Sequence, residues 1–353
     1  MSVGLTALIW TQLRSKMIRQ PPIFRAAARI INIKNDSPYN APPVIDRQMK
    51  AREWGLLITL SLLWGGSFFF NGVAVQELPT LTIVFGRVAI AAVALYGLMR
   101  IIGQPLPGDV TSWQAFGIMG LLNNFIPFCL IVWGPQEVAS GLASIFNATT
   151  PIFTILVAHF LIRDEPMTPA RLGGVLIGFV GVAAMLGHDI VTGFSFTGFA
   201  GHIFAQMALL GAALSYGCAA SFGRRFSRMG ISPLATATGQ IIASSVMLLP
   251  VMLIVDQPWQ LALPSVPVML SIVGVALLST ALAYILFFNI LKQAGATNLS
   301  LVTLLIPVSA ICLGVMFLDE TIDVIDLCGL GLIGIGLLCV DGRFLHWLNN
   351  ARH

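Results

Sequence analysis

Charged residues are scarce in this chain, at 10% of 353 residues, whereas a soluble domain carries about a quarter. Apolar residues make up 57% of the sequence, and the mean hydropathy is +0.88. This composition excludes an ordinary soluble protein and gives no sign of a nucleic-acid partner. We expect an all-α membrane protein surrounded by a lipid bilayer.

Residue groupings that support catalysis or bind a metal are also missing. The five cysteines all fall inside apolar stretches, and no pair of them has metal-ligand spacing. Gly329, Gly331 and Gly334 match the dinucleotide fingerprint, but they lie within an apolar stretch instead of after a strand. We therefore expect no catalytic residue, no metal and no cofactor, so not an enzyme. An intramembrane lipid-modifying enzyme and a non-transporting scaffold remain the alternatives.

The few charges divide the chain into long apolar stretches. A helix needs roughly 20 apolar residues to cross a bilayer, and the stretches here predict ten such helices. The expected spans are residues 54–76, 80–101, 112–134, 139–162, 169–187, 200–222, 232–254, 265–290, 296–317 and 324–341.

The positions of the basic residues predict the orientation of these helices, because Lys and Arg concentrate on the cytoplasmic side. The basic residues follow the even-numbered spans, at Arg100, Arg163, Arg171, Arg224, Arg225, Arg228, Lys292, Arg343 and Arg352. Loops on the other side hold acidic residues and no Lys or Arg. We expect a multi-pass protein of the cell (inner or plasma) membrane with both termini in the cytoplasm.

A polar pattern that ends in proline occurs twice, 156 residues apart (307 − 151). Its spacing of i, i+3, i+7 puts each set on one helix face. The two sets are Ser144, Asn147, Pro151 and Ser300, Thr303, Pro307. The chain thus resembles one five-helix unit used twice, at residues 49–188 and 189–345, with a tail at 346–353. Because five is odd, the second unit must be inverted in the membrane, as in transporters with a midplane site.

Each of these prolines predicts a broken helix, because proline removes the hydrogen bond to the carbonyl four residues earlier. Those carbonyls belong to Asn147 and Thr303. Two interpretations remain open. Either the freed backbone lines a substrate cavity, or neighbouring Ser and Thr hydroxyls repair a simple kink.

These features together resemble the drug/metabolite transporter superfamily, in its form with two EamA-type domains. The resemblance rests on the 5+5 arrangement, the Trp-Gly-Gly-Ser run from Trp64 to Ser67, and Arg87 in the second span. It also rests on the two proline-centred helices, each followed by an acidic residue and a Gly-rich span. It implies a secondary transporter that exports small metabolites such as amino acids by alternating access. Whether two copies form a homodimer stays open.

Arg87 is the only charge well inside a predicted span. It either attracts a substrate carboxylate or closes an outer gate, or it is held by helix-end carbonyls or by Glu137. No Asp or Glu lies deep in a span, which favours facilitated diffusion or exchange over proton antiport. The candidate cavity residues are Trp64, Asn71, Arg87, Asn124, Trp133, Ser144, Asn147, Pro151, Tyr216, Gln240, Tyr284, Ser300, Thr303 and Pro307.

Residues 1–48 form a basic extension with seven Lys or Arg and two Asp. A basic, partly amphipathic segment of this kind can lie on an anionic membrane surface or resemble a transit signal. Alternatively, Met49 is the true start, and the preceding residues are a translated upstream region.

Overall fold

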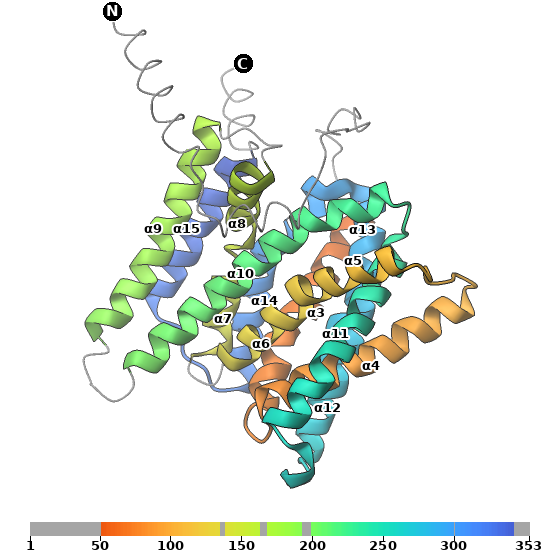
Figure 1. The fold of residues 1–353 in the computed structure, drawn as a ribbon. Helices are drawn as coiled ribbons and strands as arrows, with labels where there is room; N and C mark the ends of the chain where they lie inside the picture. Colours follow the sequence, from red (N-terminus) through yellow and green to blue (C-terminus); the bar gives the residue numbers. More distant parts are fainter. Residues whose placement is uncertain (1–50, 135–137, 163–167, 193–198, 300, 342–353) are drawn as a thin grey trace, which may run out of the picture.

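The structure, a computed structural model, describes residues 51–134, 138–162, 168–192, 199–299 and 301–341. The described residues form helices and connecting turns, without a strand (Figure 1). The segments are α3 (Ala51–Ala74), α4 (Thr80–Ile101), α5 (Val110–Gly120), η1 (Leu121–Phe125), α6 (Ile126–Trp133), α7 (Ser140–Asn147), α8 (Thr150–Val157), η3 (Ala158–Ile162), α9 (Pro169–Thr192), α10 (Phe199–Arg228), α11 (Pro233–Val255), η4 (Pro258–Gln260), α12 (Val266–Ala276), η5 (Leu277–Leu282), α13 (Ala283–Leu299), α14 (Val302–Phe317) and α15 (Val324–Asp341). The predicted extension at residues 1–48 lies outside the described residues.

Seven helical stretches in the described part are long and apolar enough to cross a membrane. They are Ala51–Ala74, Thr80–Ile101, Val110–Trp133, Ser140–Phe160, His202–Arg228, Pro233–Val255 and Val266–Ile290. Three apolar helices are shorter: Leu172–Met185, Val302–Phe317 and Val324–Cys339. At a rise of about 1.5 Å per residue, the 16 residues of α14 and the 18 of α15 cover less than the roughly 30 Å hydrocarbon core, whereas Leu172–Met185 is the apolar part of the longer helix α9, which has 24 residues. The ten predicted spans therefore remain a prediction for these three.

Two predicted boundaries are wrong, because helical structure continues beyond the apolar stretch. The sixth helix was expected to end at residue 222, but α10 extends to Arg228, so Arg224, Arg225 and Arg228 are helical and not in a loop. Cations near a helix C-terminus interact favourably with the helix dipole. The predicted loop at residues 291–295 is likewise helical, within α13.

The two prolines differ in what they do to their helices. Around Pro151 the helix is interrupted: α7 ends at Asn147 and α8 begins at Thr150. The hydroxyl of Thr150 donates to the carbonyl of Asn147 at 2.7 Å, which is the repair by a neighbouring hydroxyl. At Pro307 the expected break is absent, since α14 runs unbroken through this residue. Ser309 Oγ in the next turn donates to the Ser61 carbonyl of α3 at 2.8 Å.

Two close helix crossings join segments far apart in the sequence. A methyl group added to Gly65 of α3 would lie 2.9 Å from the backbone nitrogen of Ala310 in α14. One added to Gly217 of α10 would lie 2.9 Å from the backbone nitrogen of Thr154 in α8. Positions 154 and 310 are 156 residues apart (310 − 154), whereas the two glycines are 152 apart (217 − 65), so the crossings join equivalent helices of the predicted repeat with the glycines displaced by four residues.

Glycines also join α9 and α15, which lie side by side (Figure 1). A methyl group on Gly181 would meet the carbonyl oxygen of Gly329 at 2.8 Å, and one on Gly336 would meet that of Gly174 at 2.5 Å. The glycines of one helix lie 155 residues from their counterparts on the other, since 329 − 174 and 336 − 181 are each 155. The partner positions rise along one helix as they fall along the other, so the two helices are antiparallel. The contact is symmetric: if α9 and α15 exchange places, the same pairs of equivalent glycines meet.

Three membrane-type helices contain a π-helical segment, and two of these segments are separated by 156 residues (277 − 121). The third, η3, has no π-helical counterpart in α14. Segment η1 lies between α5 and α6, and η5 lies between α12 and α13. A π-helical turn shifts the side chains that follow it around the helix and is frequent at functional sites. The third and eighth predicted helices thus carry the same irregularity at matching positions.

Candidate functional site

Arg87 lies inside the bundle with only 5% of its surface exposed. Its Nε donates to Thr280 Oγ1 of η5 at 2.9 Å, and its Nη1 donates to Ser67 Oγ of α3 at 3.1 Å. The guanidinium carbon lies 3.7 Å from the ring centroid of Phe128 in α6, a cation–π arrangement. Among the described residues, no carboxylate forms an ion pair with it; Glu137 lies outside them. We call this group the Arg87 pole.

A second hydrogen-bonded group, the amide pole, lies nearby. Asn123 Nδ2 of η1 donates to Gln240 Oε1 of α11 at 3.1 Å and to Tyr284 Oη of α13 at 3.0 Å. The hydroxyl of Tyr284 donates in turn to Asn124 Oδ1 at 3.1 Å. Thr280 of the Arg87 pole and Tyr284 of the amide pole are four residues apart, and so are Asn124 and Phe128, so the two poles are adjacent and we treat them as one polar cluster.

The two poles are built from matching positions of the predicted repeat. Thr280, which binds Arg87, is 156 residues after Asn124 of the amide pole (280 − 124). Tyr284, which binds the amides, is 156 residues after Phe128, which stacks on Arg87 (284 − 128). Each pole therefore combines a π segment with a polar side chain from another helix: Arg87 in one case and Gln240 in the other.

Several buried polar atoms around the cluster have no hydrogen-bond partner. Both side-chain amide atoms of Asn71, which is fully buried, are unpaired, and so are Asn124 Nδ2 and Ser279 Oγ. Asn71 lies one turn beyond Ser67 on the same face of α3, and Ser279 precedes Thr280 in η5. A buried unpaired polar group costs about 1–3 kcal/mol, so these atoms indicate a place where a ligand or water binds.

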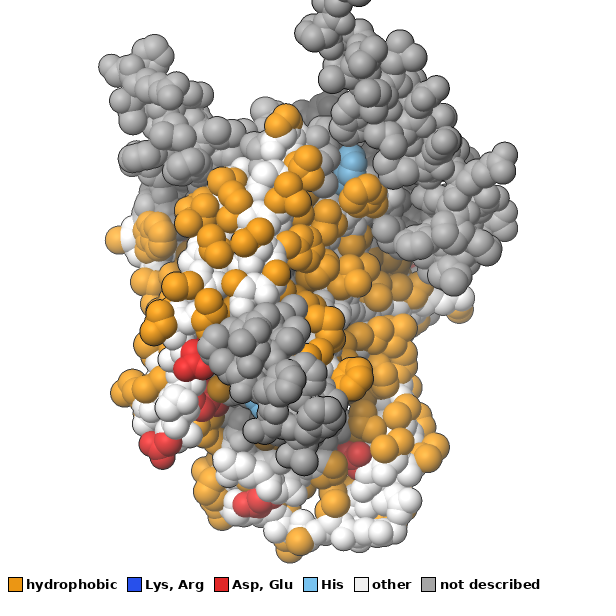
Figure 2. Space-filling view, turned by 90° about the vertical axis from the view of Figure 1, so that its left-hand side faces the viewer, with side chains coloured by type: hydrophobic (Ala, Val, Ile, Leu, Met, Phe, Trp, Pro, Cys, Tyr) orange, Lys and Arg blue, Asp and Glu red, His pale blue; other side chains and the backbone are white. Residues whose placement is uncertain are grey.

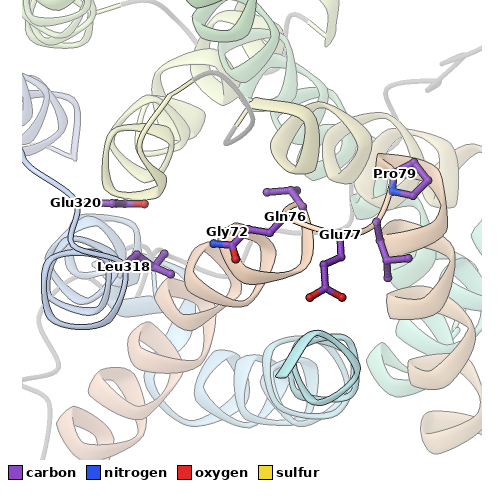
Figure 3. Close-up of a pocket in the computed structure, with 8 residues that line it drawn as sticks. Gly72, Gln76, Glu77, Pro79, Leu318 and Glu320 are labelled. Carbon is purple, nitrogen blue, oxygen red and sulfur yellow. The ribbon is translucent and has the colours of Figure 1, made fainter. Parts of the chain in front are cut away.

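A pocket of the structure lies apart from the residues of the polar cluster. That pocket, of about 700 Å³, is an open depression at the end of α3, lined by Gly72, Val75, Gln76, Glu77, Leu78, Pro79, Leu318 and Glu320 (Figure 3). No predicted cavity residue lines it. Because its wall is formed by turns at the helix ends, we interpret it as a surface depression distinct from the polar cluster.

Acidic side chains gather at one end of the apolar surface (Figure 2). Asp256 at the end of α11 accepts from the backbone and hydroxyl of Thr82 in α4, at 2.6 and 2.8 Å. Glu77 accepts from the backbone nitrogen of Ser265, which precedes α12, at 2.6 Å, and the hydrogen bonds from Ser265 lower its pKa. Carboxylates are stabilised at helix N-termini by the unpaired N–H groups, so these two contacts join the two halves of the chain.

Glu320 forms a third contact of this kind. Its carboxylate accepts from the backbone nitrogens of Ser140 and Gly141 and from the Ser140 hydroxyl, at 2.8, 3.1 and 3.0 Å, at the start of α7.

We expect Glu320→Gln to lower the free energy of unfolding by about 0.5–2 kcal/mol, the range for losing a helix cap. The thermal unfolding midpoint of the purified protein in detergent measures this loss. Asp319→Asn is the matched control, because it removes a neighbouring exposed charge at a positive φ that Asn tolerates; equal shifts in both variants would contradict the capping role.

The structure brings some predicted cavity residues together and leaves others apart. Arg87, Asn124, Gln240 and Tyr284 belong to the polar cluster, and Tyr216 and Asn71 adjoin it. Trp64 lies on the same α3 face as Ser67 and Asn71 and packs against Phe287 at 5.6 Å. The others lie elsewhere or outside the described residues: Trp133 in the apolar packing around α10, Ser144, Asn147 and Pro151 on α7 and α8, Thr303 and Pro307 on α14, and Ser300, which is not described.

Three members of the cluster were absent from the predicted cavity set: Ser67, Asn123 and Thr280. Ser67 ends the Trp-Gly-Gly-Ser run, and Asn123 adjoins Asn124. Thr280 could have been found by adding the repeat offset of 156 residues to Asn124. Phe128 carried no polar signal, since only the fold places its ring against a buried cation.

Comparison with known proteins gives consistent matches. "Uncharacterized transporter YoaV" of Bacillus subtilis is 27% identical over 286 residues, covering 80% of this chain and 94% of that protein. "Uncharacterized inner membrane transporter YedA" of Escherichia coli K12 is 24% identical, covering 83% and 92%. "Protein PecM" of Dickeya dadantii is 23% identical, covering 79% and 89%.

The fold and the family agree with these relatives. A crystal structure with 17% identity superimposes with a TM-score of 0.58, covering 83% of this chain and 98% of the other, a likeness of fold alone. The EamA-like transporter family profile matches residues 53–187 and again residues 203–340, well over half of the chain. With its apolar helices, the chain is a multi-pass membrane protein, and it belongs to the EamA-like transporter family.

Proposed function

We propose that this transporter is a secondary carrier that exports small metabolites, of the amino-acid class or related to it, by alternating access around the polar cluster. The observation that carries the proposal is the composition of the cluster. Its side chains come from both halves: Arg87 of the first meets Thr280 of the second, and Gln240 of the second meets Asn123 of the first. A site shared by two halves opens to either side when they move relative to each other.

An inverted repeat of five helices in each half forms part of this proposal. The exchange-symmetric contact between α9 and α15 supports it, because antiparallel helices related by a two-fold axis in the membrane plane form such a contact. The matched π segments, at an offset of 156 residues (277 − 121), support it independently.

We also propose that all ten predicted helices span the inner or plasma membrane, with both termini in the cytoplasm. The basic residues that follow the even-numbered helices support this orientation. A helix as short as α14, with 16 residues, is accommodated by local thinning of the bilayer at modest cost.

A carrier fits the site better than the alternative of an intramembrane enzyme. Within the described residues, the polar cluster contains no His, Cys or carboxylate that could act as a general base or nucleophile. Its groups are one guanidinium, amides and hydroxyls, which recognise a ligand without transforming it.

An untargeted comparison of released metabolites tests the proposal. Cells that produce the protein should accumulate a small set of metabolites in the medium, relative to cells with the same plasmid and an early stop codon. Thr280→Val, produced at equal membrane levels, should reduce that release. Identical media from producing and non-producing cells would contradict the proposed export.

A further inference from the structure

Several side-chain acceptors of the polar cluster already accept a hydrogen bond from another member. Asn124 Oδ1 accepts from Tyr284, and Gln240 Oε1 accepts from Asn123. The hydroxyl oxygens of Ser67 and Thr280 accept from Arg87. These oxygens keep a second lone pair, but none of them carries a negative charge that could neutralise a bound cation.

Backbone carbonyls near the π segments are occupied as well. Ser215 Oγ of α10 donates to the carbonyl of Leu122 at 2.7 Å, and Ser244 Oγ of α11 donates to that of Gly120 at 3.1 Å. The hydroxyl of Thr280 donates to the carbonyl of Val275 at 2.8 Å. These carbonyls are the groups that a charged amine would otherwise use at membrane depth.

Donors, in contrast, remain available. Asn124 Nδ2 and the Ser279 hydroxyl are buried and unpaired. Asn71 adds one further donor and one acceptor, whichever way its amide is turned. Arg87 contributes a full positive charge that no described carboxylate neutralises.

We propose that the polar cluster selects a carboxylate-bearing organic anion that has no charged amine, such as a hydroxy, oxo or N-acylated acid. This inference rests on the proposed carrier function and narrows its substrate from the amino-acid class to related acids that lack a charged amine. The carboxylate binds the guanidinium that Ser67 and Thr280 hold in position, because it adds a full negative charge and can accept two parallel N–H bonds, which a neutral hydroxyl cannot do. A free ammonium group would lie near a like charge without a counter-ion.

The released metabolites of producing cells, sorted by charge, test this selectivity. We expect the protein-dependent metabolites to be anions at neutral pH. Arg87→Gln should lower their release about tenfold or more, as expected for losing a hydrogen bond to a charged group. Arg100→Gln is the matched control, because it removes an exposed charge from the inner end of the same helix, and it should retain release to within about twofold.

The possible outcomes separate this inference from the carrier function. Protein-dependent release of amines or free amino acids would overturn the anion selectivity and leave the carrier intact. No protein-dependent release would overturn both. If Arg87→Gln fails to accumulate in the membrane, the metabolites released by wild-type cells decide the charge class of the substrate. In that case Arg87→Lys, which keeps the positive charge, should retain part of the release.

If Arg87→Gln is well folded and releases anions at the wild-type rate, the proposed role of the Arg87 pole is overturned.

Discussion

Gly336→Leu is expected to remove most of the folded protein from the membrane. Any side chain at this position meets the carbonyl of Gly174 and, at 2.9 Å, the backbone nitrogen of Gly178 in α9. Backbone atoms cannot turn away as a flexible side chain can, so α9 and α15 must separate. Overpacking of this kind costs about 1–3 kcal/mol or more. The yield of monodisperse protein after detergent extraction, and its thermal unfolding midpoint, measure the effect.

Gly331→Leu is the matched control on the same helix, because nothing lies within 4 Å of a methyl group placed there. Position 331 is exposed, so the substitution should leave the protein yield and the thermal unfolding midpoint nearly unchanged. Similar behaviour of the two variants would show that close approach of α9 and α15 is not needed for folding.

Thr280→Val is expected to reduce transport about tenfold to a hundredfold while the protein stays folded. Valine has the same shape as threonine, but it removes the acceptor of Arg87 Nε and the donor to the Val275 carbonyl. A buried charged group that loses a partner costs about 1–3 kcal/mol or more. The loss of the Thr280 hydroxyl changes the position of the Arg87 guanidinium and leaves the packing of η5 intact. Initial rates of release for a metabolite identified in wild-type cells measure the effect.

Thr238→Val provides the comparison for this experiment. Thr238 is also fully buried, but its hydroxyl donates only to the Leu234 carbonyl one turn earlier in its own helix, at 2.9 Å. Its replacement should leave the release rate within about twofold of wild type. Equal losses in both variants would mean that buried hydroxyls matter for the helices in general and that the contact with Arg87 has no special role.

Much of the fold could be predicted from the sequence, because apolar stretches and their polar boundaries follow directly from the properties of the bilayer. α4 and α11 begin and end close to the expected residues. The errors lie where helical structure continues into polar sequence, as at Arg228 of α10 and Leu299 of α13. The hydropathy of the sequence indicates which residues lie in the hydrocarbon core of the bilayer. A helix can extend beyond that core as long as its backbone hydrogen bonds are stable.

The candidate site could be predicted only in part. A charge in an apolar span identified Arg87, and intramembrane amides identified Asn124 and Gln240. The π segments could not be foreseen, because they depend on tertiary contacts such as Ser215 with the Leu122 carbonyl. Those segments decide which side chains face the cluster.

The prolines show why a repeat in sequence need not be a repeat in local structure. Pro151 follows an interruption in which the Thr150 hydroxyl satisfies the Asn147 carbonyl. No such interruption occurs at Pro307, where α14 continues. The same residue type at equivalent positions thus has two local outcomes, and the surrounding polar side chains decide between them.

The difference between the two poles has a consequence for the resting conformation. In a carrier of the proposed kind, two identical halves would give the inward-open and outward-open forms the same free energy. Arg87 lies on a phenyl ring and binds hydroxyls, whereas Gln240 binds amides, so the two forms solvate a buried cation unequally. This chemical inequality biases the resting state towards one side of the membrane without any coupled ion.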